Sequence, residues 1–482
     1  MRSRVYNNVG DFNMKNNNKY FYSLLLLPLL GGLSLLTPNK VSKVEGYDKS
    51  ALPTTINLKD YSDEAIREYY SNLNALGDAE RTGDNLLKNL KPILSNGQKY
   101  YSYDVSSGKD IWKMYEITDR DWTLSPASSI EGYDASTNTI TGYKYGESAS
   151  KPGTNPYIHA LYVNRSAENK VHAWATDEST SSHGNNAKYC IDREHIWPKS
   201  QGFEDSTEDP GTSGARGDPM HLWAGDSYVN SALHSNYFYG YVDKTKTYTD
   251  GKDKYEYAAN NLMGFSKTLG GSISVFEPQD SDKGDIARAV FYMVARYNNI
   301  AGTDSTIEND NPNLELVNDL AEWKATGYIS TSSTTGKLGI IQDLLEWNKL
   351  DPVDTYELHR NNLLYGNFTN NRNPFIDFPE WADLIWGADK NTKSANPLSD
   401  SIARPKDFVL PEGNLDNDTV QKDNSIIPGA PNIYVYIGVG AVAAIILVVV
   451  IVVLLKGNKK QKKALKKVAK KVVKSNSKSK KK

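Results

Sequence analysis

The chain has 482 residues, of which 39% are hydrophobic and 24% charged, and these ordinary fractions exclude a collagen-like, wholly disordered or multi-spanning membrane protein. Its one cysteine, Cys190, excludes an internal disulfide, zinc ribbons and iron–sulfur sites. The formal net charge of −2 hides an asymmetry, because residues 456–482 carry 14 lysines and no acid, whereas residues 46–455 carry a formal charge of −20.

The first hydrophobic segment lies near the N-terminus. Basic residues precede an apolar run over about residues 21–36, which is the order found in a secretory signal peptide. A buried helix is the alternative, but Pro28 and the pair Gly31–Gly32 disfavour it. We expect residues 1–45 to be a signal peptide with a polar lead-in.

Two helices are predicted next along the chain. Apolar residues at helical spacing indicate one helix from Asp63 and a second over Leu86–Leu94, which ends at Asn96–Gly97. Residues 46–99 therefore form a helical N-terminal layer, or they merge with the rest of the body into one large α+β unit. The residues from 100 to 190 are rich in Tyr, Thr, Ser, Gly and Asn, and they predict loops and short strands.

The segment Cys190–Ser200 contains adjacent candidates for chemistry, Glu194 and His195. Pro198 prevents a paired strand from continuing. Neighbouring residues of a regular strand face opposite sides, so these two side chains share one site only if the strand ends or bulges there. A carboxylate beside an imidazole offers a hard oxygen ligand and a base near neutrality, although most such pairs are ordinary surface residues.

A second informative segment runs from Gly217 to Asn236. His221 and Leu222 indicate a short strand, and residues 225–227 indicate a turn with candidate helix N-caps. A helix carrying Asn230 follows. The two segments together predict the order strand, loop, strand and helix.

Two more helices are predicted over Asp285–Tyr297 and Leu338–Trp347. From residue 388 the chain becomes polar and proline-containing, which predicts a stalk over residues 388–432. Several arginines in the helical part either contact phosphates or pair with neighbouring acidic residues; these are Arg288, Arg296, Arg360 and Arg372.

The second hydrophobic segment, residues 433–455, carries no charge and is long enough to cross roughly 30 Å of hydrocarbon. Lysines follow at once, and flanking cations stay on the cytoplasmic side. We therefore expect a single-pass protein of the cell membrane with its body outside and residues 456–482 in the cytoplasm. The tail either lies on anionic inner-leaflet lipid as a basic amphipathic helix or stays solvated.

Further motifs lie in the C-terminal half, including Phe276-Glu-Pro and the run Asn371-Arg-Asn-Pro-Phe375. With the two segments above, they make residues 100–387 resemble the bacterial, secreted endonuclease I family. The resemblance implies an α+β fold in which a ββα-metal, or His-Me finger, core is embedded in a larger, mainly helical body. In this chain one C-terminal transmembrane helix is expected in addition.

The resemblance also implies a role for each matched residue. His195 matches the general base, and Glu194 and Asn230 match the ligands of Mg²⁺, for which Mn²⁺ or Ca²⁺ can substitute. Arg216 is the one arginine between the two segments and is assigned as the phosphate clamp. The implied activity is hydrolysis of DNA, with RNA as a second substrate, with little sequence specificity and with 5′-phosphate ends.

The chain departs from the family pattern after Asn230. Relatives have an arginine soon after the Val-Asn pair, where this chain reads Leu233-His234 with one apparent extra residue. Either His234 takes the place of this arginine at acidic pH or the position is unimportant. We expect His221 to support the site rather than to bind the metal.

The acidic body argues against a nucleic-acid enzyme, because phosphates are bound mostly by Lys and Arg. Physiological salt, however, shortens the repulsive field to about 8 Å. The primary hypothesis is a metal-dependent extracellular endonuclease. The alternative is a non-catalytic surface receptor that binds nucleic acid or a host partner. No obligate protein partner is inferred.

Overall fold

The structure is a computed structural model. It describes residues 50–101, 103, 110–145, 156–163, 191–203, 214–270, 273–300, 312–318 and 335–405. The predicted signal segment, membrane span and lysine-rich tail (1–45, 433–455 and 456–482) lie outside these ranges. In the part of the chain that is described, no helix is both long and apolar enough to cross a membrane.

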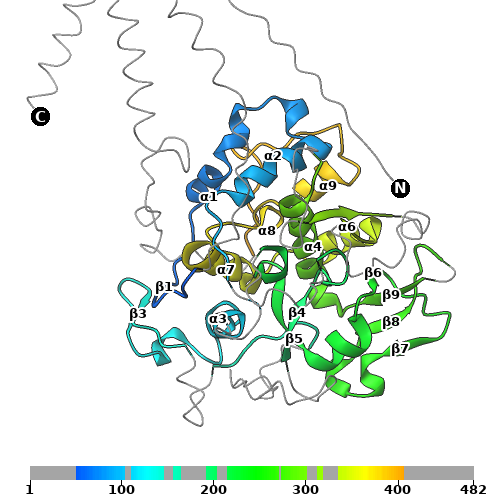
Figure 1. Ribbon diagram of the computed structural model, residues 1–482, viewed down its shortest axis with the longest axis horizontal. Coiled ribbons are helices and arrows are strands. Elements are labelled where there is room, and N and C mark those ends of the chain that lie inside the picture. The colour runs from blue at the N-terminus through cyan, green and yellow to red at the C-terminus, as the bar shows by residue number, and fades with distance from the viewer. Residues whose placement is uncertain are drawn as a thin grey trace, which may run out of the picture. The chain divides into compact units, whose positions relative to one another are not determined.

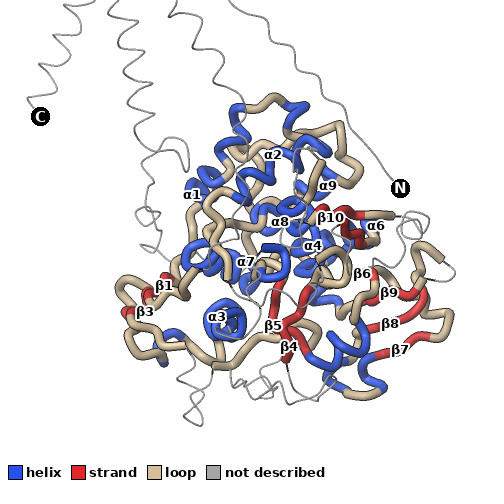
Figure 2. The backbone as a smooth tube through the Cα atoms, in the orientation of Figure 1, coloured by secondary structure: helices blue, strands red, loops and turns tan. Residues whose placement is uncertain are grey.

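Helices and short strands alternate along these residues, which gives an α+β fold (Figures 1 and 2). The strands are β1 (Thr55–Asn57), β2 (Tyr133–Asp134), β3 (Thr139–Thr141), β4 (Ile191–His195), β5 (Leu222–Asp226), β6 (Phe238–Tyr239), β7 (Tyr248–Asp250), β8 (Leu262–Phe265), β9 (Ser274–Glu277), β10 (Asn313–Leu316) and β11 (Thr335–Leu338). The α-helices are α1 (Asp63–Tyr69), α2 (Gly83–Ser95), α3 (Asp110–Thr118), α4 (Lys283–Tyr297), α6 (Ile341–Leu350), α7 (Thr355–Leu363), α8 (Pro374–Asp377) and α9 (Trp381–Ile385).

Helix α4 is the centre of the helical part. All 15 of its residues are buried, and α2, α6 and α8 pack around it (Figure 1). The predicted helix over Asp285–Tyr297 is thus confirmed, but neighbours cover it on every side rather than along one apolar stripe. Its buried charges are paired, since Arg288 Nη2 lies 2.6 Å from a carboxylate oxygen of Glu357.

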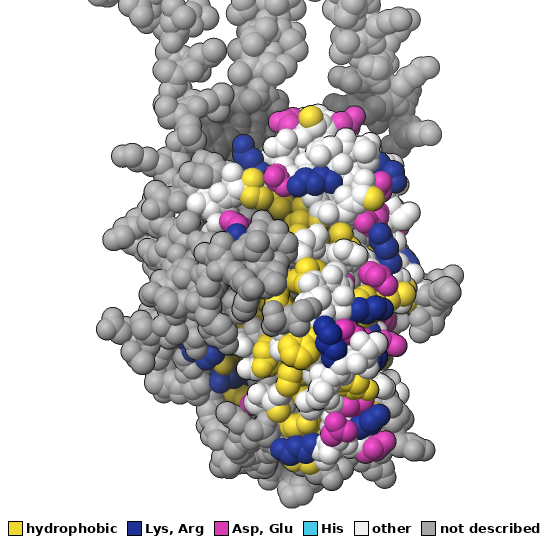
Figure 3. Space-filling model, turned by 90° about the vertical axis from the view of Figure 1, so that its right-hand side faces the viewer, with side chains coloured by type: hydrophobic (Ala, Val, Ile, Leu, Met, Phe, Trp, Pro, Cys, Tyr) yellow, Lys and Arg dark blue, Asp and Glu magenta, His cyan; other side chains and the backbone are white. Residues whose placement is uncertain are grey.

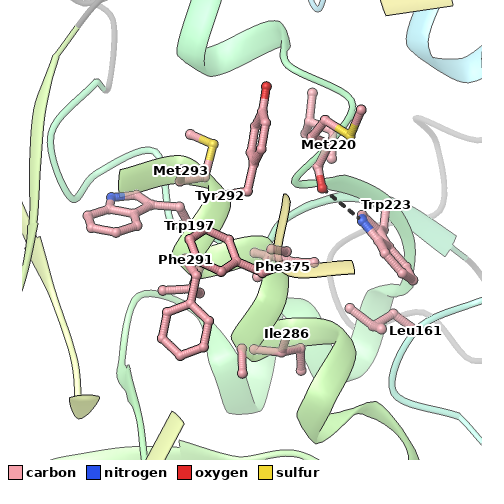
Figure 4. Packing of buried hydrophobic residues seen from close by; sticks show 14 of the residues in the cluster. Leu161, Trp197, Met220, Trp223, Ile286, Phe291, Tyr292, Met293 and Phe375 are labelled. Carbon is pink, nitrogen blue, oxygen red and sulfur yellow. Dashed lines mark hydrogen bonds between the residues drawn. The ribbon is translucent and has the colours of Figure 1, made fainter. Parts of the chain in front are cut away.

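The antiparallel strands β4 and β5 pack next to this centre. Their register pairs Glu194 with Trp223 and His195 with Leu222. In Figure 4, Trp197, which follows β4, lies beside Met293 of α4. The Nε1 group of Trp223 donates a hydrogen bond of 3.2 Å to the backbone oxygen of Met220. Trp197 and Trp223 are almost completely buried, so two large side chains anchor these strands in the core.

The remaining strands form separate small sheets. A four-stranded sheet has the order β6-β9-β8-β7, a three-stranded sheet the order β1-β3-β2, and β10 pairs with β11 in parallel. Figure 2 shows β7, β8 and β9 side by side, away from the helices around α4.

Some predicted boundaries are wrong. The helix expected from Leu338 begins at Ile341, because Leu338 ends β11 and pairs with Leu316. The turn expected at Gly225 begins later, because Gly225 and Asp226 extend β5 opposite Asp192 and Ile191. Helix α3 lies where loops and short strands were predicted. The helical spacing of its apolar residues was missed because polar and aromatic residues surround it in the sequence.

The outer segments belong to the same core as the rest of the described chain. Helix α2, in the expected N-terminal layer, packs on α4, and β1 pairs with β3. At the other end, the Ala395 amide donates to the Arg81 carbonyl and Trp381 Nε1 donates to Asp400. Residues 388–405 therefore pack on the body, and the stalk boundary predicted at 388 is too early. The rest of the predicted stalk lies outside the described residues.

The helical arginines pair with acidic or polar groups inside the protein. Arg372 makes two hydrogen bonds, of 2.8 and 2.7 Å, to the two oxygens of Asp377. Arg360 contacts Asp119, and Arg296 donates to Gln98. All four are almost completely buried, so the reading of these residues as phosphate contacts is wrong. Pairing with acidic residues is confirmed for Arg288, Arg360 and Arg372, whereas Arg296 bonds to Gln98 and Tyr100.

Candidate active site

His195 is the last residue of β4, where the strand ends before Pro198. Its Nε2 lies 3.0 Å from the carbonyl oxygen of Arg216. A carbonyl oxygen only accepts hydrogen bonds, so Nε2 carries the proton and the lone pair of the neutral ring is on Nδ1. Burial lowers the pKa of His195 well below its ordinary value, with further lowering from His221 and Lys199. The imidazole is therefore neutral at neutral pH.

One tyrosine ring connects His195 with two arginines. The centroid of Tyr103 lies 4.7 Å from that of His195. The guanidinium carbons of Arg193 and Arg216 lie 4.0 and 4.9 Å from the same Tyr103 ring centroid. Arg193 also approaches the ring of Trp112 at 5.3 Å. Two positive groups are thus held by cation–π contacts beside the imidazole, a setting that favours an anion.

His221 fixes the backbone around the site. Its Nε2 donates to the Ala215 carbonyl at 2.7 Å, and its Nδ1 accepts from the Trp197 amide at 3.4 Å. Burial lowers its pKa to about 4, against the opposing effect of Asp218. Both ring nitrogens contact the backbone, so His221 positions the turn Gly214–Gly217 that carries the Arg216 carbonyl.

Glu194 extends from the opposite face of β4 and is 1% exposed. Its Oε1 accepts a hydrogen bond of 2.6 Å from the Tyr162 hydroxyl and another of 2.6 Å from His234 Nδ1. A Cβ added at Gly225 would lie 2.7 Å from the Glu194 Cβ, so this position requires glycine for the close approach of the two strands. Glu194 therefore lies across β5 toward the helix that carries Asn230.

That helix is a π-helix over Val229–His234, and the amide of Ser235 donates to the carbonyl of Asn230 at 2.7 Å. Asp226 Oδ1 accepts from the Val229 amide at its start. Such a wide turn accommodates one more residue than an α-helix does, which accounts for the extra residue noted in the sequence. Asn230 is half-buried and lies four residues before His234, whose Nδ1 contacts Glu194.

The donors available for a cation are few. Among the described residues there is no cluster of three or more His, Cys, Asp or Glu side chains arranged for a metal. Glu194 and Asn230, the two residues predicted as ligands, carry a carboxylate and an amide oxygen, which are hard donors. Such a set fits Mg²⁺, which usually keeps several waters, and it fits Zn²⁺ poorly.

Two residues of the site could not be found from local sequence patterns. Tyr162 is separated from Glu194 by 32 positions, and Tyr103 from Arg193 by 90. Each comes from a tyrosine-rich region that contains no motif. Tyr162 and Tyr103 reach the β4–β5 pair only in the folded chain, and they lie on its opposite faces.

The fold is α+β with a buried, neutral histidine at the end of β4, and comparisons with known proteins identify the family. The family model for endonuclease I matches residues 82–380. The chain therefore belongs to the endonuclease I family and is a nuclease of that family.

Two relatives are called extracellular ribonuclease. The one from Bacillus amyloliquefaciens is 32% identical over 284 residues, which are 55% of this chain and 84% of the relative. The one from Bacillus subtilis (strain 168) is 31% identical over 310 residues, which are 64% of this chain and 77% of the relative. No solved structure matches the chain.

Proposed function

We propose that this chain is an extracellular, metal-dependent endonuclease that hydrolyses phosphodiester bonds of DNA and RNA with little sequence specificity and leaves 5′-phosphate ends. The observation that carries the proposal is the fixed tautomer of His195, whose Nε2 donates to the Arg216 carbonyl. Nδ1 is then the basic atom, while the buried carboxylate of the preceding residue, Glu194, extends from the other face of β4.

In this proposal His195 takes the proton from the attacking water through Nδ1. A general base of this kind contributes about 10²- to 10⁴-fold to the rate. Burial keeps the ring neutral before the reaction, and the Arg216 carbonyl stabilises the imidazolium that forms afterwards. The Arg216 guanidinium, held over Tyr103, binds a phosphate oxygen.

Glu194 and Asn230 would hold the cation. When bound, Mg²⁺ supplies positive charge at the scissile phosphate and at the leaving 3′-oxygen. The protein's own contribution is orientation, because the Glu194 carboxylate is fixed by two hydrogen bonds and the helix with Asn230 is anchored by Asp226.

The overall acidity of the chain is compatible with this role. In the coloured part of the face drawn in Figure 3, acidic and basic side chains are interspersed beside a hydrophobic band. Repulsion between exposed charges and DNA is screened beyond about 8 Å in physiological salt. Local contacts at the site, including those of Arg193 and Arg216, then decide binding.

We infer an extracellular location from the basic and apolar N-terminal segment and from the names of the two relatives. The apolar stretch 433–455 and the lysines after it support anchoring of the body to the outer face of a cell membrane.

The test compares three oligonucleotides of one sequence, made of RNA, DNA and 2′-O-methyl RNA, with the purified full-length chain and Mg²⁺. Attack by water predicts cleavage of all three, with a 5′-phosphate and a 3′-hydroxyl at every cleaved bond. Cleavage of RNA alone, with cyclic phosphate ends, would show attack by the 2′-hydroxyl and contradict the proposal. Retention of all three without cleavage would support the alternative of a non-catalytic receptor.

A further inference from the structure

The hydrogen bonds on Glu194 are unusually concentrated on one atom. Oε1 accepts from both Tyr162 and His234, each at 2.6 Å. A carboxylate only accepts hydrogen bonds, so His234 Nδ1 carries the proton of this contact. The two donors therefore restrict rotation of the Glu194 carboxylate about its Cγ–Cδ bond.

Tyr162 is itself rigidly held. Its backbone amide donates to Asp282 at 2.5 Å, and its carbonyl accepts from Asn261 at 2.6 Å. The preceding residue, Leu161, exchanges backbone hydrogen bonds with Ala224 and Asp226 of β5. The ring of Tyr162 meets Phe276 edge to face at 5.2 Å. Its hydroxyl donates the short bond to Glu194 and lies 3.4 Å from the hydroxyl of Tyr239, which is the longer contact.

His234 is held from a different direction. Its ring stacks on Tyr239 with a centroid distance of 4.7 Å and an interplanar angle of 23°. The side chain is completely buried. His234 is the last residue of the π-helix Val229–His234, and this helix places its Nδ1 against Glu194.

We propose that Tyr162 and His234 are positioning residues that occupy Oε1 of Glu194, so that the carboxylate offers its other oxygen, Oε2, to a divalent cation as a one-oxygen ligand. This inference rests on the proposed function, in which Glu194 binds the cation. One-oxygen binding suits Mg²⁺, which demands near-ideal octahedral geometry. Removing either donor frees the carboxylate to rotate and weakens the cation site.

The experiment measures Mn²⁺ binding to the purified full-length chain by electron paramagnetic resonance, without any nucleic acid. Tyr162→Phe removes one hydroxyl. His234→Leu and His234→Asn have nearly the same shape, but only Asn keeps an N–H near the position of Nδ1. We expect Tyr162→Phe and His234→Leu to weaken binding about 10- to 100-fold, and His234→Asn to restore most of the affinity.

Glu194→Gln separates this inference from the proposed function. If Glu194→Gln leaves Mn²⁺ affinity unchanged, the metal site itself is elsewhere and both proposals fail. If Glu194→Gln abolishes binding but Tyr162→Phe and His234→Leu bind as tightly as the parent, only the positioning role is overturned. Should His234→Leu fail to fold, Tyr162→Phe, checked by thermal unfolding, decides by the same criterion.

Discussion

The carbonyl oxygen of Arg216 accepts a hydrogen bond from Nε2 of His195 at 3.0 Å. Arg216 thereby contributes twice, because its backbone selects the tautomer of the imidazole while its guanidinium lies over Tyr103 near the same ring. The turn that presents this carbonyl is held by His221 through the Ala215 carbonyl. The base and the candidate phosphate contact therefore depend on one short turn.

The tautomer leads to a prediction for His195→Gln. The Gln side chain amide can still donate to the Arg216 carbonyl, but it cannot accept a proton from water. We expect the cleavage rate of a DNA oligonucleotide to fall by about 10²- to 10⁴-fold, while the midpoint of thermal unfolding stays close to that of the parent. Activity within tenfold of the parent would exclude His195 as the base.

The contacts of Tyr103 predict that its ring matters more than its hydroxyl. Tyr103→Phe retains the aromatic face that Arg193 and Arg216 approach, whereas Tyr103→Leu removes it. Loss of two cation–π contacts predicts an increase in KM for DNA of about tenfold in Tyr103→Leu. Tyr103→Phe is the control and should stay within about twofold. Equal KM values for the two variants would contradict a role for the ring.

The order of strand, loop, strand and helix in the site could be predicted because local signals mark it. Pro198 ends the first strand, and the polar run around Asn230 follows a short apolar strand. The resemblance to the family also implied one extra residue after Asn230. Its consequence, a π-helix, depends on hydrogen bonds that no pattern of residue types specifies.

The surroundings of the site could not be predicted for a different reason. Tyr162 and Tyr103 occupy regions where tyrosines are common, and nothing local distinguishes them from tyrosines that only pack. The polar residues after 388 suggested a stalk, but the Ala395 amide and Asp400 find partners on the body. Composition reports how polar a segment is, and it does not report whether those polar groups find partners inside the fold.

His221 predicts a dependence of stability on pH. Its pKa is lowered to about 4 by burial, whereas an unfolded histidine titrates near 6.5. Below about pH 6.5 the unfolded chain therefore binds a proton that the folded chain does not, so this contribution to stability is lost as the pH falls toward 4. We expect His221 to account for a loss of about 2 kcal/mol between pH 7.5 and 5.

The measurement for His221 is urea unfolding at several pH values. His221→Gln keeps a donor for the Ala215 carbonyl but cannot titrate. The variant should lose less stability on acidification than the parent, even if it is less stable at pH 7.5. Parallel pH profiles of the two proteins would show that His221 does not titrate on unfolding in this range.

The pair of Arg372 and Asp377 predicts that a conservative substitution is costly. Both side chains are completely buried, and Arg372 makes two hydrogen bonds to Asp377 and one to Asn362. Lysine cannot reproduce this planar geometry, so Arg372→Lys should lower the free energy of unfolding by about 3 kcal/mol. Arg404→Lys is the matched control, because its partner Asp63 is 45% exposed and the expected loss is below about 1 kcal/mol. If urea unfolding shows that both variants lose the same free energy of unfolding, burial does not determine how much the Arg372–Asp377 pair stabilises the protein.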